Sequence, residues 1–93
     1  MLFFEQREKT QKEIDAEKNF GEIVKMLREK HSYSQETLAT KTNLTIETIQ
    51  NIENYGQNIE LDTIVLFAKA FGISLVELFT YFEECYDAEN KIR

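Results

Sequence analysis

The sequence predicts an all-α, single-domain protein with five helices and an N-terminal helical extension. Three observations predict this fold class. The 93 residues include no Pro and only three Gly, so few positions interrupt a helix. Apolar residues recur at i, i+3, i+4 and i+7 in several segments, which is the period of an amphipathic helix. Residues that favour helix N-caps precede those segments. A chain of this length has room for one small core.

Composition excludes several classes of protein. Hydrophobic residues make up 42% of the chain and charged residues 30%, as in an ordinary globular domain. No apolar run approaches the roughly 20 residues that span a bilayer. The start, MLFFEQREKTQKE, has no basic region before its short apolar patch, so it is not a secretory signal. Cys85 is the single cysteine, which excludes an internal disulfide or a Cys-based metal site. We expect a cytoplasmic protein.

Residues 1–18 are expected to form a helical extension or arm. The pairs Glu5–Lys9 and Glu8–Lys12 have the i,i+4 spacing that supports an exposed helix. One interpretation is a solvated helix. The other is an arm whose Phe3, Phe4 and Ile14 pack on a partner, because two adjacent phenylalanines are costly to leave in water.

Residues 19–31 are expected to form the first core helix. Asn19 with Glu22 has the spacing of a capping box. One helical face carries Phe20, Ile23, Val24 and Leu27. Alternatively, the helix continues unbroken from the extension. His31 has no second His or Cys with which to form a ligand set, so we expect it to bind no metal and to have no catalytic role.

The stretch Ser34 to Tyr55 has the pattern of two short helices joined by a tight turn. The helices are expected at residues 35–41 and 45–54, each after a good N-cap residue, Ser34 or Thr45. In the break at residues 42–44, Asn43 tolerates the left-handed conformation that a reversal needs. The inward-facing positions are Leu38, Ala39, Leu44, Ile49 and Ile52. This is the pattern of a helix-turn-helix, whose second helix can enter the DNA major groove.

Two more helices are expected after a loop at residues 57–60. Apolar residues from Leu61 to Phe71 predict a largely buried helix that ends at Gly72. Ser74 and Glu77 form a capping box that opens the last helix. That helix is apolar around more than one face, at Leu75, Leu78, Phe79, Phe82 and Tyr86. An apolar patch of this kind favours a homodimer. The polar residues 87–93 are expected to fray.

Five helices in this order resemble the Cro and phage-repressor family of transcriptional regulators, also called the xenobiotic-response-element type. The resemblance covers about residues 20–80. It rests on LREKHSYSQETLATKTNLTIETIQNIENY and LDTIVLFAKAFGISLVELF. It implies a repressor-like DNA-binding domain at residues 19–86, with the helix-turn-helix as its second and third helices. It also implies a structural ion pair between Arg28 and Glu53.

The resemblance further implies roles at a DNA interface. Gln35, Thr45 and Asn54 would contact the DNA backbone; the alternative interpretation of these three residues is simple capping and solvation. The base-reading positions fall on Ile46, Glu47 and Asn51, on the exposed face of the third helix. These side chains suit a thymine methyl, cytosine N4 and adenine, respectively. The full set expected at the interface is Gln35, Lys41, Thr45, Ile46, Glu47, Thr48, Gln50, Asn51 and Asn54.

The charge of the chain opposes a polyanionic ligand. The formal net charge is −6, and between Ser34 and Gly56 Lys41 is the only basic residue, against Glu36, Glu47 and Glu53. Few cations imply low nonspecific affinity and a shallow salt dependence. The family usually has an apolar residue at Thr42, Gly at Asn43 and Pro at Ile59, departures that leave the fold prediction intact.

Two function classes therefore stay open. The first is a dimeric, sequence-specific DNA-binding transcriptional regulator of a palindromic operator. The second is a protein-interaction module with the same fold, such as an antirepressor, an antitoxin-like adaptor or a DNA mimic. Such a module would use its acidic surface, its N-terminal arm or its last helix. The sequence has no catalytic constellation, phosphate-binding Gly loop or metal-ligand spacing, so we expect neither an enzyme nor a cofactor.

Overall fold

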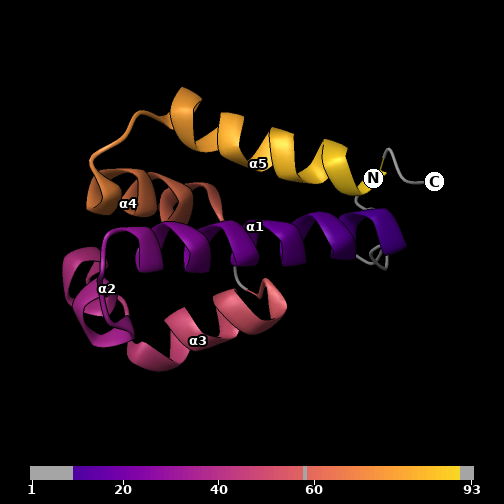
Figure 1. Ribbon diagram of the computed structural model, residues 1–93. Coiled ribbons are helices and arrows are strands. Elements are labelled where there is room, and N and C mark those ends of the chain that lie inside the picture. The colour runs from indigo at the N-terminus through magenta and orange to yellow at the C-terminus, as the bar shows by residue number, and fades with distance from the viewer. Residues whose placement is uncertain (1–9, 58, 91–93) are drawn as a thin grey trace, which may run out of the picture.

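The computed structural model of the chain describes residues 10–57 and 59–90, with the backbone alone for residues 86–90. In these ranges the chain forms five helices and no strand (Figure 1). They are α1 (Gln11–Lys30), α2 (Gln35–Thr42), α3 (Ile46–Tyr55), α4 (Leu61–Phe71) and α5 (Leu75–Asn90). The predicted all-α fold, with the helix-turn-helix as its second and third helices, is confirmed.

Helix α1 lies in the middle of the molecule. It packs against α3, α4 and α5, while α2 packs against α3 and α4. In Figure 1, α3 lies on one side of α1, and α4 and α5 lie on the other. All five helices contribute to one buried core, made of Phe20, Ile23, Val24, Leu27, Leu38, Ala39, Ile49, Ile52, Phe67, Ala68, Phe71 and Leu78.

Helix α1 is continuous and begins at Gln11. Thr10 is its N-cap: the Thr10 hydroxyl accepts from Glu13 N at 3.2 Å, and the Glu13 carboxylate accepts from Thr10 N at 2.8 Å. The predicted cap at Asn19 is wrong, because Asn19 is buried inside the helix. The alternative holds, in which one helix runs from the extension into the core. Both capping patterns are present in the sequence, and the chain uses the first.

Two glycines let α1 and α3 approach each other to backbone contact. A Cβ atom at Gly21 would overlap the carbonyl oxygen of Ile52. Gly56, which ends α3 with φ 71°, faces α1, and a Cβ atom there would lie 2.8 Å from Lys18 N and overlap the Glu17 carbonyl. Gly21 therefore occupies the middle of a helix because a neighbouring backbone takes the space of a side chain.

The turn between α2 and α3 has the predicted chemistry. Ser34 Oγ accepts from Thr37 N at 3.0 Å and Thr45 Oγ1 accepts from Thr48 N at 3.1 Å, so both N-caps are confirmed. Asn43 is left-handed, with φ 61°. The break begins one residue later than predicted, because Thr42 is the last residue of α2. Its buried hydroxyl donates to Leu38 O at 2.8 Å, which satisfies a polar group in the core.

Helix α4 has the predicted bounds, and Gly72 ends it with φ 68°. One expectation is wrong: Leu61 is 70% exposed, so the helix begins in solvent. Ser74 Oγ accepts from Glu77 N at 3.0 Å as the cap of α5. Residues 87–90, predicted to fray, are the last turn of α5. Residues 91–93 and the proposed arm at Phe3 and Phe4 lie outside the described residues.

Among the described residues, no single helix is long and apolar enough to cross a membrane. Leu61–Phe71 and Leu75–Cys85 reach that length and composition only as a pair, which is bent by 103° at the break.

Candidate nucleic-acid interface

An ion pair between Arg28 and Glu53 joins α1 to α3. Arg28 Nε donates to Glu53 Oε2 at 2.7 Å and Arg28 Nη2 donates to Glu53 Oε1 at 3.1 Å, so the pair is bidentate. The two side chains are only 12% and 1% exposed. The hydrogen bond to Glu53 raises the pKa of Arg28. Arg28 also donates to Tyr33 O at 3.0 Å, which fixes the loop before α2.

Gln35 extends this network from the first turn of α2. Its Nε2 donates to Glu53 Oε1 at 3.1 Å, and its Oε1 accepts from Gln50 Nε2 at 3.4 Å. Two side chains of α3, the buried Glu53 carboxylate and the Gln50 amide, therefore orient the Gln35 amide. Sequence reasoning assigned Gln35 and Gln50 separately and did not predict this link, because the partners are 15 and 18 residues apart in the chain.

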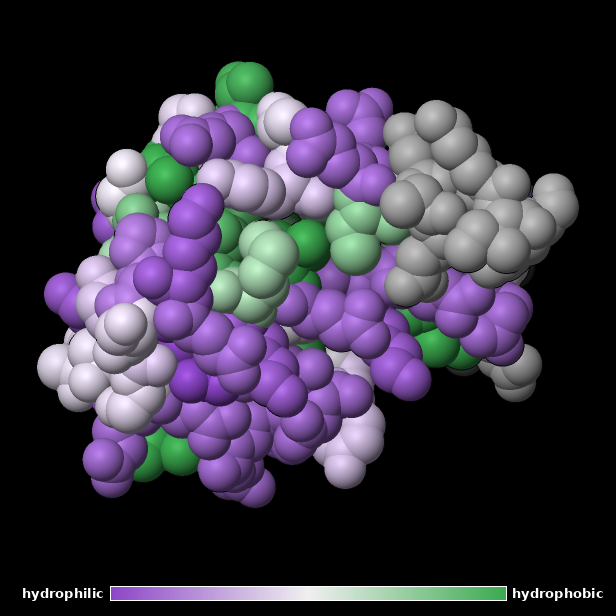
Figure 2. All heavy atoms as spheres, viewed as in Figure 1, coloured by the Kyte–Doolittle hydropathy of each residue, from purple (hydrophilic) through white to green (hydrophobic). Residues whose placement is uncertain are grey.

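Helix α3 has one buried face and one exposed face. Ile49 and Ile52 are completely buried. The opposite face is polar apart from Ile46, which is 38% exposed, and the Tyr55 ring near its end, which is 63% exposed. In Figure 2 the side of the molecule that holds α2 and α3 is mostly hydrophilic. On this face Glu47, Gln50 and Asn54 are exposed, and Thr48 and Asn51 are half-buried.

The threonines that open α3 bond to each other. Thr45 Oγ1 donates to Thr48 Oγ1 at 2.8 Å while it caps the helix. The capping interpretation of Thr45 thus describes its contacts in the structure. Thr45 is nevertheless exposed, and its contact with DNA stays a prediction.

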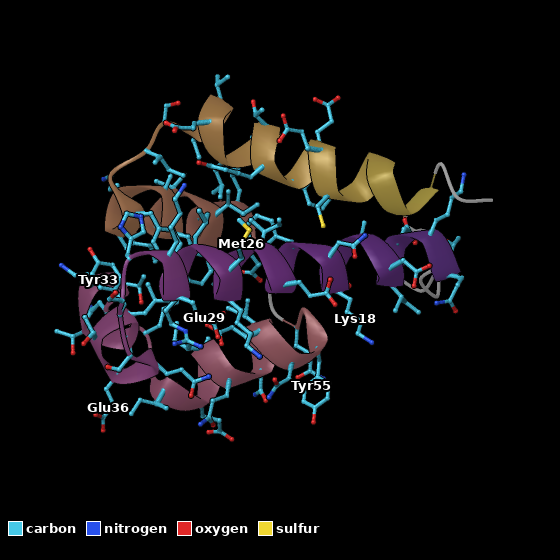
Figure 3. All side chains as sticks on the ribbon, viewed as in Figure 1. Lys18, Met26, Glu29, Tyr33, Glu36 and Tyr55 are labelled. Carbon is cyan, nitrogen blue, oxygen red and sulfur yellow. The ribbon has the colours of Figure 1, made fainter. Side chains whose placement is uncertain are left out.

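The charges on this side agree with the sequence analysis. The Glu53 carboxylate is paired with Arg28, which leaves Lys41 against Glu36 and Glu47, all three exposed. The Lys41 ammonium lies 5.0 Å from the centre of the Tyr33 ring, a cation–π contact. Figure 3 shows Glu36 pointing away from α2 at the edge of the molecule.

Other chemistry-bearing residues have packing roles. His31 stacks on Tyr33 at 5.3 Å and on Phe71 at 5.4 Å between ring centres. Cys85 is half-buried and packs against the core. In the part of the chain that the structure describes, no three His, Cys, Asp or Glu side chains are grouped so that they could hold a metal ion.

Comparison with known proteins gives one family and a set of solved structures. The family model described as "Helix-turn-helix" matches residues 24–78. The wild-type restriction-modification controller protein C.Esp1396I is 26% identical, with a TM-score of 0.71 over 75% of this chain and 91% of that chain. The controller protein C.AhdI from Aeromonas hydrophila is 31% identical, with a TM-score of 0.65 over 69% of this chain and 97% of that chain. No curated protein sequence matches.

Proposed function

The chain belongs to the helix-turn-helix family of DNA-binding transcription regulators, and from that premise we propose that it reads the major groove of a specific sequence through α3, as a homodimer. The observation that carries this proposal is the two-sided character of α3. Its inner face is completely buried at Ile49 and Ile52, which anchors the helix in the core, and its outer face presents polar side chains.

The outer face has groups that suit base edges. Asn51 carries the amide that pairs with adenine, Glu47 the carboxylate that accepts from cytosine N4, and Ile46 an apolar surface for a thymine methyl. Gln35 and Asn54 would position the protein on the phosphates, as the polar groups and helix N-termini of such proteins do. Since phosphate contacts need not be cationic, the acidic balance lowers the affinity without excluding DNA.

The homodimer part of the proposal rests on α4 and α5. Leu61 is 70% exposed, Val76 76% and Phe79 42%, and apolar exposure on this scale favours a subunit interface. In Figure 1 these helices lie across α1 from α3, so a dimer formed there leaves both copies of α3 free. Two half-sites would then lie about one helical turn apart in a palindromic operator.

We extend the proposal to the biological role of the solved relatives. C.Esp1396I and C.AhdI are controller proteins of restriction-modification systems. We propose a cytoplasmic regulator of that kind, without enzymatic activity or a cofactor. The genomic position of the operator found in the experiment below tests this extension: it should lie in a promoter of restriction or methyltransferase genes.

The test of the function is selection from a random duplex library at about 50 mM and about 200 mM salt, a range over which phosphate contacts weaken. We expect an enriched palindrome at the lower salt. A double variant, Glu47→Ala with Asn51→Ala, provides the matched control, because it removes two proposed base-reading side chains from the outer face of α3. It should enrich nothing.

Absence of enrichment at either salt, with a protein folded by circular dichroism, would overturn DNA reading. The exposed carboxylates of Glu36 and Glu47 favour the second candidate in that case, an acidic interaction module. A basic protein partner would then be the ligand to seek.

A further inference from the structure

The C-terminal end of α3 has no lysine or arginine. The N-terminal residues of a recognition helix reach base edges. Helix α3 has ten residues, about 15 Å, whereas the major groove is about 12 Å wide. In the proposed complex, its C-terminal end would therefore lie beside the phosphate backbone. There α3 and the following loop offer Asn54, Tyr55 and Gln57, all exposed and all neutral.

The N-terminal half of α1 supplies a lysine at this end. Gly56 ends α3 directly against the backbone of Glu17 and Lys18, and a Cβ atom at Gly56 would lie 2.8 Å from Lys18 N. Lys18 is exposed. Figure 3 shows Lys18 extending from α1 on the side of α3, toward the end of α3 where Tyr55 lies. Its long stem can carry the ammonium around that end of the helix.

This lysine stands outside the part of the chain that the helix-turn-helix family model matches, which begins at residue 24. It is positioned only because α1 begins at Gln11 and runs past the end of α3. Two carboxylates lie one turn from Lys18 on α1: Asp15 is half-buried at i−3, and Glu22 is exposed at i+4.

We propose that Lys18 binds a DNA phosphate at the C-terminal end of α3, together with the neutral groups of Asn54 and Tyr55. The extended α1 thus adds a phosphate contact to a motif that is poor in cations. This inference rests on the proposed DNA-binding function. Glu22 weakens the contact by repelling the same phosphate.

The test measures the affinity of the full chain for the selected operator between about 50 and 200 mM salt, with four variants. In Lys18→Gln the slope of log K against log salt should become shallower by about 0.9 per protomer, or about 1.8 per dimer. Lys18→Arg keeps the charge and should keep the slope. Glu22→Gln should bind more tightly than the wild type.

Lys69→Gln is the matched control, because Lys69 is exposed on α4, across α1 from α3 (Figure 1). It removes the same charge from the chain and should leave the slope unchanged. Equal slopes for Lys18→Gln and Lys69→Gln, with operator binding intact in the wild type, would overturn the role of Lys18 and leave the proposed function standing. A wild type that binds no operator would overturn both.

Discussion

Glu53 is the side chain at which three helices meet. It belongs to α3, accepts two hydrogen bonds from Arg28 of α1 and accepts one from Gln35 of α2. A carboxylate that is 1% exposed is tolerable only because these donors satisfy it. The same residue therefore holds α3 against α1 and orients the amide at the start of α2.

Breaking this pair should destabilise the fold. Glu53→Leu leaves the Arg28 guanidinium without its carboxylate, so we expect the free energy of unfolding to fall by about 3 kcal/mol. Urea denaturation measures it. Adding Arg28→Met should recover much of the loss, since no buried charge is then left unpaired. Glu36→Gln, on the exposed part of α2, is the control and should change stability by less than about 0.5 kcal/mol. A Glu53→Leu loss no larger than that of the control would contradict this account.

Replacing Asn51 should change the base preference and leave the fold unchanged. Asn51→Ala removes a bidentate amide, so discrimination between the operator and its single-base variants should drop by about 1–3 kcal/mol. Competition binding with those duplexes measures it. Asn54→Ala, at a residue proposed to contact phosphates, should weaken binding to all the duplexes alike. Unchanged selectivity in Asn51→Ala would show that Asn51 is not one of the base-reading residues.

Most helix ends were predictable because they depend on neighbouring residues. Ser34, Thr45, Asn43 and Gly72 act through hydrogen bonds or dihedral angles within a few residues. The start of α1 was not predictable in this way, since Thr10 and Asn19 both have capping patterns. Gly21, which lowers helix propensity, lies inside α1 because the α3 backbone leaves no room for a side chain there, and that backbone is distant in sequence.

The candidate interface was predictable in part, for the same reason. The exposed positions of α3 follow from helical periodicity. The Arg28–Glu53 pair came from the family resemblance, because no spacing rule links residues 25 apart. The bond from Gln50 to Gln35 and the place of Lys18 beside Gly56 depend on how α1, α2 and α3 pack, so only the fold reveals them.

The two glycines Gly21 and Gly72 should respond differently to the same change. Gly21→Ala gains about 0.5–1 kcal/mol of helix propensity. It also forces a methyl into the Ile52 carbonyl, so we expect a net loss above about 2 kcal/mol. Gly72→Ala meets no atom within 4 Å and should lose only about 1–2 kcal/mol for its left-handed backbone. Thermal unfolding of both variants measures the difference. Equal losses would show that α1 and α3 can move apart freely.

The molecule as a whole has a polar side at α3 and an opposite side, at α4 and α5, where several large apolar side chains are exposed among charged ones. Helix α1 separates α3, with its polar outer face, from α4 and α5, where Leu61, Val76 and Phe79 are exposed. Figure 2 shows hydrophilic residues over α2 and α3, and a strip of apolar residues between α1 and the helices above it, which also carry hydrophilic residues. This division suits a protein that binds DNA with one side and its own copy with the other.

A charge among the exposed apolar side chains of α5 should therefore separate the subunits of the proposed homodimer. Val76→Glu, at a residue 76% exposed, should leave the monomer folded and shift the sedimentation coefficient from dimer to monomer. Operator affinity should fall with it, because one half-site is lost. Val76→Ala keeps the face neutral and should stay dimeric. A Val76→Glu variant that remains a dimer would place the interface elsewhere.

The backbone contact between α1 and α3 has a consequence for the geometry of an operator. The orientation of α3 relative to α1 is fixed by Gly21, Gly56 and the Arg28–Glu53 pair. Helix α3 therefore cannot tilt within a protomer to follow a displaced half-site. One extra base pair between half-sites rotates the second by about 35° around the duplex axis, at 10–10.5 base pairs per turn. In the proposed dimer, the rotational phase would have to be restored by overtwisting or bending the DNA, so the stiffness of the uncontacted central base pairs would contribute to operator preference.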